Sequence, residues 1–170
     1  FCSVTIEVKE LSLSGNVELS DNCNPVPIRI ELYEAGTPNA NPILVQSYIE
    51  QMNSDGSYMV ILANLEPGTY GVYIKAETYL QVFIGDIVVD SSVTDINLNN
   101  LILGDIAGST FGDNIVNSND LSVVLAAFNS QLGTPSYNSR ADLVCNSQIN
   151  ILDVSRLLFF YLQVGDNPQN

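Results

Sequence analysis

The chain has 170 residues, 46% of them hydrophobic, so it can fold as one medium domain or two small domains without cross-links. Five Lys and Arg residues stand against 19 Asp and Glu residues, there is no His, and the formal net charge is −14. This charge argues against binding to nucleic acid or to anionic membrane surfaces, because both need clusters of positive charge. No apolar run approaches the length of a membrane-spanning helix, so membrane insertion is not expected either.

Short runs of alternating polar and apolar residues, separated by turn residues, fill residues 1–103. The runs lie at 4–8, 17–19, 28–32, 43–49, 58–62, 70–74, 82–84, 87–89 and 93–98. About seven to nine short strands at this spacing predict an antiparallel β-sandwich in which each sheet turns one face to the core. Lys75 continues one alternating run, and we expect its side chain to face solvent.

Two turn-to-strand segments in this region are more specific. Residues 53–58 read NSDGSY and residues 65–70 read LEPGTY. Together they resemble the signature of carboxypeptidase-regulatory-like and Cna-B-like domains. The resemblance implies an Ig/prealbumin-like sandwich that acts as a spacer or adhesion module without activity. Some Cna-B domains carry a Lys–Asn isopeptide bond, for which Lys9 and Lys75 are the available donors.

The first strand leaves two interpretations open. Val4, Ile6 and Val8 alternate with polar residues at the start of the chain. Such a strand can pair within its own sandwich, or it can complete the sheet of a neighbouring copy through main-chain hydrogen bonds.

The segment that follows the strands is apolar. Residues 98–104 read LNNLILG and contain no Pro, which is not the composition of a flexible linker. We therefore predict two domains that pack directly on each other, a β-sandwich over residues 1–103 and a small helical module over residues 104–170.

A repeat dominates the C-terminal region. Residues 116–125 read VNSNDLSVVL and residues 149–158 read INILDVSRLL, 33 residues further on. Each copy has Asn, two residues and Asp, and then a run with helical periodicity. This is the pattern of the second half of an EF-hand-type calcium loop, whose closing carboxylate lies at the positive end of the helix dipole. The alternative is a pair of helix N-caps without a metal, since Asn and Asp also cap helices.

The loop positions can be assigned by counting back from each closing Asp. The second loop runs from Asp142 to Asp153, eleven residues later, but Val144 in its third position cannot ligate. The first loop runs from Asp105 to Asp120 and needs a four-residue insertion within residues 107–112. The predicted Ca²⁺ ligands, with Ile115 and Gln148 offering backbone carbonyls, are Asp105, Asp113, Ile115, Asn117, Asp120, Asp142, Asn146, Gln148, Asn150 and Asp153.

Four short motifs in this region resemble the dockerin family: GD at 104–105, VNSNDL at 116–121, AD at 141–142 and INILD at 149–153. The resemblance covers residues 104 to about 164. It implies two calcium loop–helix motifs packed antiparallel, a secreted protein, and a cohesin partner. Many cohesin-binding dockerins carry Ser-Thr just before the closing Asp and Lys-Arg five and six residues after it. The first copy here has Ser118-Asn119 and Leu125-Ala126, and the second has Ile151-Leu152 and Leu158-Phe159.

Two further features leave alternatives open. Residues 157–162 read LLFFYL, which is apolar almost all round, so the surplus apolar surface should cover the sandwich or another subunit. Cys2, Cys23 and Cys145 fit one disulfide and one remaining thiol, and the pairing stays open.

No catalytic pattern is present: without His there is no Ser–His pair, and the glycines form no phosphate loop. We therefore expect a non-enzyme. The sequence favours a secreted, extracellular structural subunit of a filament or surface layer at the cell surface, stabilised by Ca²⁺ and assembling with copies of itself. The alternative is a cohesin-binding anchoring end of a larger cell-surface or cellulosome-type enzyme. A weaker alternative is a carbohydrate-binding module.

Overall fold

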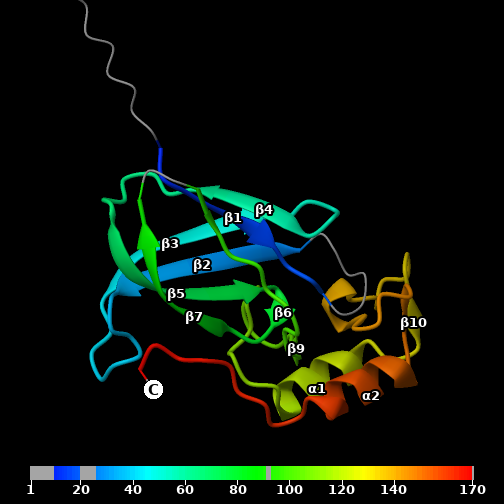
Figure 1. Cartoon of the computed structure of the whole chain (residues 1–170). Helices are drawn as coiled ribbons and strands as arrows, with labels where there is room; N and C mark the ends of the chain where they lie inside the picture. The colour runs from blue at the N-terminus through cyan, green and yellow to red at the C-terminus, as the bar shows by residue number, and fades with distance from the viewer. Residues whose placement is uncertain (1–9, 20–25, 91–92, 170) are drawn as a thin grey trace, which may run out of the picture.

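The computed structural model describes residues 10–19, 26–90 and 93–169. Two sheets face each other in the N-terminal part, and a smaller helical part lies beside them (Figure 1). The first sheet has the order β4-β1-β8 and consists of β1 (Ser12–Asn16), β4 (Ser57–Ile61) and β8 (Val93–Asp95). The second has the order β3-β2-β5-β7 and consists of β2 (Pro27–Glu34), β3 (Leu44–Gln51), β5 (Gly68–Ala76) and β7 (Val82–Val89).

The core lies between the two sheets and follows the alternation of the sequence. Ile28, Ile30 and Leu32 on β2 are fully buried, as are Leu13 on β1 and Val72 on β5. Every second side chain of a strand points to the same face, so the intervening residues of β2 point away from this core. The predicted β-sandwich is therefore confirmed for the described residues.

The pairing differs from the predicted antiparallel arrangement at one edge. β1 pairs with β4 antiparallel but with β8 parallel, with Ser12 opposite Val93. The chain crosses from β7 in one sheet to the open edge of β1 in the other, and alternation in the sequence does not encode strand direction. The predicted runs at 82–84 and 87–89 form one strand, β7, with a register shift beside Gly85.

The C-terminal part begins on a strand that pairs with the sandwich. β9 (Leu103–Asp105) pairs antiparallel with β6 (Thr78–Tyr79), so the predicted boundary between residues 103 and 104 falls inside a strand. Further along the chain come α1 (Ser118–Ala126), β10 (Ser130–Gln131), the short 3₁₀ helix η1 (Ser139–Ala141), β11 (Gln148–Ile149) and α2 (Ile151–Phe159). β10 and β11 pair with each other, and one cluster of buried side chains runs from the sandwich into the packing of α1 on α2.

The C-terminal tail returns to the sandwich after α2. Figure 1 shows this segment in red, running back beneath the strands. The Asp166 N–H donates to the Gln81 carbonyl at 2.9 Å, and the Asn39 N–H donates to the Pro168 carbonyl at 3.0 Å. The tail thus ties the helical part to two segments of the sandwich.

Some sequence-based expectations fall outside the described residues. These are the strand at Val4, Ile6 and Val8, the side chain of Lys9, and the cysteines Cys2 and Cys23. Cys145 is disulfide-bonded. Within residues 10–19, 26–90 and 93–169, no helix has the length and apolar character needed to cross a bilayer.

Candidate metal centre

Both repeated motifs start a helix, and both do so in the same way. Asn117 caps α1 and Asn150 caps α2, each accepting a hydrogen bond from the backbone two residues on. Asp120 and Asp153 accept the N–H of the cap residue three positions earlier, at 2.8 Å in each case, which completes a capping box. Helix capping by these Asn and Asp residues is therefore part of the structure, whether or not the loops also bind a metal ion.

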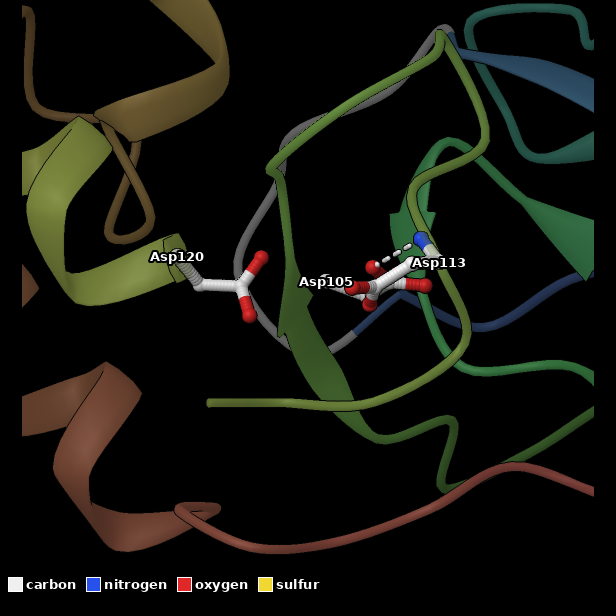
Figure 2. Close-up of side chains that lie close together, drawn as sticks. All are labelled: Asp105, Asp113 and Asp120. Atoms are coloured by element: carbon white, nitrogen blue, oxygen red, sulfur yellow. Dashed lines mark hydrogen bonds between the residues drawn. The ribbon is translucent and has the colours of Figure 1, made fainter. Parts of the chain in front are cut away.

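Three carboxylates of the first loop converge on one place. Oxygens of Asp105, Asp113 and Asp120 lie within 4.8 Å of one another, with Asp105 and Asp120 buried and Asp113 exposed. Figure 2 shows their side chains brought together from β9, the following loop and the start of α1. The other two predicted ligands are adjacent, because the Asn117 amide nitrogen lies 3.5 Å from both Asp113 Oδ2 and the Ile115 carbonyl oxygen.

The insertion predicted within residues 107–112 forms a compact turn. The Gly112 N–H donates to the Ser109 carbonyl at 3.0 Å, and the Arg140 guanidinium donates to the carbonyls of Ser109 and Thr110. Gly112 has φ +65°, and a Cβ there would lie 1.9 Å from Asp105 Oδ1. Because only glycine leaves room for this carboxylate, Gly112 lets the longer loop bring Asp113 back to Asp105.

The second loop contains two carboxylates and two amides among its predicted ligands. Asp142 and Asp153 are buried, while Asn146 is exposed and Asn150 half-buried. Asp142 accepts the N–H groups of Asn146 and Ser147 at 3.1 and 2.8 Å. Asp153 Oδ1 accepts the Val144 N–H at 3.1 Å, so the third position contributes a backbone donor. The Asn146 side chain accepts the Gln148 N–H at 2.9 Å. This hydrogen bond holds Gln148, whose backbone carbonyl is a predicted ligand.

The two loops are equivalent in their hydrogen bonding despite the insertion. Asp105 accepts the N–H groups of Asp113 and Asn114 at 2.9 and 2.8 Å, as Asp142 does with the matching residues of the second loop. Asn114 and Ser147, next to the fifth position, have φ +70° and +65°. An EF-hand loop has glycine at this sixth position for the same sharp turn. The two loops thus share this turn and its hydrogen bonds, and the assignment of their side chains as Ca²⁺ ligands stays a prediction.

One residue at the site was missed by the sequence reasoning. Lys75 on β5 was expected to face solvent, but its side chain is 2% exposed and forms an ion pair with Asp105. It also lies 3.3 Å from Asn114 Oδ1. The alternation was correct in placing Lys75 on the outer face of the sheet. It failed because the loop after β9 covers that face.

Burial acts against the charges of this pair. It lowers the pKa of Lys75 below its usual value, while the hydrogen bond and charge of Asp105 oppose the shift. Burial also raises the pKa of Asp105, while Lys75 and the N–H donors of Asp113 and Asn114 oppose this shift. Arg29 beside Lys75 is itself paired with Glu31 at 3.2 Å, and its guanidinium lies 5.0 Å from the centre of the Phe111 ring.

The donor sets fit a hard divalent cation. Carboxylate, carbonyl and amide oxygens are the ligands that Ca²⁺ takes, usually six to eight at a time. The first loop offers three carboxylates, Asn117 and the Ile115 carbonyl, and the second offers two carboxylates, two amides and the Gln148 carbonyl. Asn and Asp oxygens would hold the ion, and the charge it adds would offset carboxylates gathered at a helix start.

A second feature of this part is an exposed apolar stripe on α2. Ile151, Leu152, Leu158 and Phe159 are 61%, 55%, 50% and 79% exposed. They lie at positions i, i+1, i+7 and i+8, which share one side of a helix. Leu157 points the other way and is fully buried. The surplus apolar surface expected on this helix therefore exists, and the sandwich residues that the structure describes leave it exposed.

Comparison with known proteins gives a fold likeness. No protein-family model matches the chain, and no curated protein matches it. The chain is similar to one in a crystal structure of a type II cohesin–X-dockerin complex from Acetivibrio cellulolyticus, an N-terminal interface mutant. The TM-score is 0.64 and the identity 19%, over 91% of this chain and 97% of that chain. A C-terminal interface mutant of the same type of complex gives a TM-score of 0.61 and 21% identity over the same shares.

At these identities the likeness shows the fold alone. It extends over both the sandwich and the helical part, since only 9% of this chain lies outside it. A carbohydrate binding protein from Bacteroides uniformis ATCC 8492 matches 55% of this chain and 41% of its own, with 16% identity and a TM-score of 0.35, too low to support the carbohydrate-binding alternative.

Proposed function

We propose that this chain is the dockerin-bearing side of a cohesin–dockerin type assembly, a non-catalytic, secreted module whose two loops bind Ca²⁺. This is the anchoring alternative from the sequence, and it displaces the self-assembling filament as the favoured function. The observation that carries it is the apolar stripe on α2. Its residues occupy the positions at which many cohesin-binding dockerins carry their recognition residues.

The stripe supports an apolar mode of recognition. In the first copy the same positions hold Ser118, Asn119, Leu125 and Ala126, all exposed and more polar than their counterparts on α2. A partner that buries Phe159 and its neighbours on α2 gains the apolar area that dominates binding energy, with aromatic anchors contributing most. The fold likeness to chains of cohesin–X-dockerin complexes supports the same class of partner.

Calcium has a defined place in this proposal. The closing residues Asp120 and Asp153 are both ligand candidates and capping-box residues of α1 and α2. An ion bound in a loop would fix the start of the helix that follows it. The recognition stripe begins at Ile151, directly after the Asn150 cap, so its geometry depends on that loop.

Calorimetry tests the proposal. It measures how a panel of type II cohesins, including that of Acetivibrio cellulolyticus, binds the full chain in calcium and in chelator. We expect at least one cohesin to bind in calcium, and binding to weaken in chelator. Phe159→Asp should weaken it by about a hundredfold or more, as expected for a central apolar anchor.

Met59→Asp is the matched control, because Met59 is 60% exposed on β4 of the sandwich, outside the helical part. It should bind as the unaltered chain does. No binding to any cohesin, or an equal loss in the two variants, would contradict the proposal.

A further inference from the structure

The ion pair between Lys75 and Asp105 crosses from one part of the chain to the other. Lys75 belongs to β5, a central strand of the four-stranded sheet, and Asp105 ends β9 and opens the first loop. Lys75 is 2% exposed and Asp105 is fully buried. A buried ammonium is costly unless it is paired and hydrogen-bonded, so this lysine is held in place by the Asp105 carboxylate and by the Asn114 amide oxygen at 3.3 Å.

The second loop shows what occupies the same position when no lysine is present. The oxygen of Asp105 that binds Lys75 is Oδ2, which also accepts the Asn114 N–H at 2.8 Å. In the second loop, Asp142 Oδ2 accepts the Ser147 N–H at 2.8 Å and the Tyr137 hydroxyl at 2.7 Å. Lys75 and Tyr137 therefore donate to equivalent oxygens, one as a cation and the other as a neutral hydroxyl.

The difference matches the number of carboxylates in each loop. The first loop gathers three, from Asp105, Asp113 and Asp120, and the second has two, from Asp142 and Asp153. With the charge of Lys75 counted, both loops carry the same net charge of −2, which is the charge that one Ca²⁺ neutralises. The other cations near Lys75 and the first loop are balanced elsewhere, Arg29 by Glu31 and Arg140 by Glu77.

We propose that Lys75 is a resident counter-ion of the first loop, supplied by the sandwich. It holds the three carboxylates together when calcium is absent, and it lowers the affinity of this loop for calcium. Because Lys75 lies on the sandwich, the calcium affinity of the first loop depends on the docking of the two parts. The inference rests on the proposed calcium function of the loops.

Calcium titration of Lys75→Met by calorimetry tests the inference, together with melting in chelator. The variant keeps most of the buried aliphatic chain and removes the charge. We expect the calcium affinity of the first loop to rise by about tenfold or more, because a positive charge beside the ion is lost in a partly buried site. We also expect a lower melting temperature in chelator, where three carboxylates are left without a cation.

Two controls assign the effect. Tyr137→Phe removes the equivalent hydrogen bond in the second loop without changing charge, so the affinity of that loop should change little. Asp120→Asn lowers the calcium affinity of the first loop. In this background, Lys75→Met should leave the calcium affinity of the second loop unchanged.

Each outcome is decisive. An unchanged or weaker affinity of the first loop in Lys75→Met, with two sites intact in the unaltered chain, overturns the inference and leaves the calcium function standing. A variant that folds only when calcium is added supports it. A variant that stays unfolded at saturating calcium overturns it, because calcium then fails to replace the lysine. An unaltered chain that binds no calcium overturns the calcium function and this inference together.

Discussion

Single residues decide whether the first loop can close. Gly112 combines a left-handed backbone, φ +65°, with a carboxylate 1.9 Å from where a Cβ would lie. The neighbouring Gly108 has φ +81° but nothing within 4 Å of its Cβ position. The two glycines of one turn thus separate the cost of the backbone conformation from the cost of displacing Asp105.

We predict that Gly112→Ala destabilises the chain by about 2 to 4 kcal/mol, because backbone strain and the displacement of a buried, ion-paired carboxylate add up. Gly108→Ala should cost about 1 kcal/mol, from strain alone. Denaturant unfolding in chelator measures both. Calcium titration should show the first loop weakened in Gly112→Ala and unaffected in Gly108→Ala. Equal losses in the two variants would mean that the contact with Asp105 has no energetic weight.

At the scale of elements, each helix depends on the residue that closes its loop. Asp153 is fully buried and accepts the N–H groups of Val144 and Asn150 at 3.1 and 2.8 Å. Asn146 is exposed and accepts one N–H, from Gln148. We predict that Asp153→Ala costs about 2 to 4 kcal/mol, since two backbone donors lose their acceptor and one of them belongs to the helix-cap residue Asn150.

Asn146→Ala should cost less than about 1 kcal/mol, because its donor can turn to water. Helical circular dichroism during denaturant unfolding, in chelator, measures these losses. A calcium titration of both variants then tests the ligand assignment. If Asn146→Ala impairs calcium binding more than Asp153→Ala does, the register of the second loop is wrong.

The elements also show what the sequence could and could not predict. Alternation identified β2 to β5, and the Asn-x-x-Asp repeat identified the starts of α1 and α2, because these signals are local. The parallel pairing of β8 with β1 depends on a crossover between sheets, which leaves no local trace.

Counting back from Asp120 in the same local pattern named the three carboxylates that the structure groups, Asp105, Asp113 and Asp120. The contacts that the sequence did not predict are long-range. The burial of Lys75 was missed because it depends on a loop 30 residues away in the chain covering the outer face of β5. Gly112 was missed as a named residue, since its role appears only when Asp105 lies against it.

For the whole molecule, the contacts between the two parts predict a single unfolding unit. β6 pairs with β9, Lys75 pairs with Asp105, and the tail at Asp166 donates to the Gln81 carbonyl. A buried ion pair that loses one partner costs several kcal/mol, so neither part can unfold without destabilising the other. Stability added by a ligand at the loops should therefore reach the sandwich.

Scanning calorimetry in calcium and in chelator tests this coupling. We predict one transition in each condition, with calcium at a hundred times its dissociation constant raising the midpoint by about 5 to 10 °C per occupied loop. The shift arises because calcium binds the folded loops and not the unfolded chain. Removing the closing carboxylates with Asp120→Ala and Asp153→Ala together should abolish it. A melting temperature that is the same with and without calcium would show that the loops only cap the helices. Two separate transitions would show that the sandwich and the helical part unfold independently.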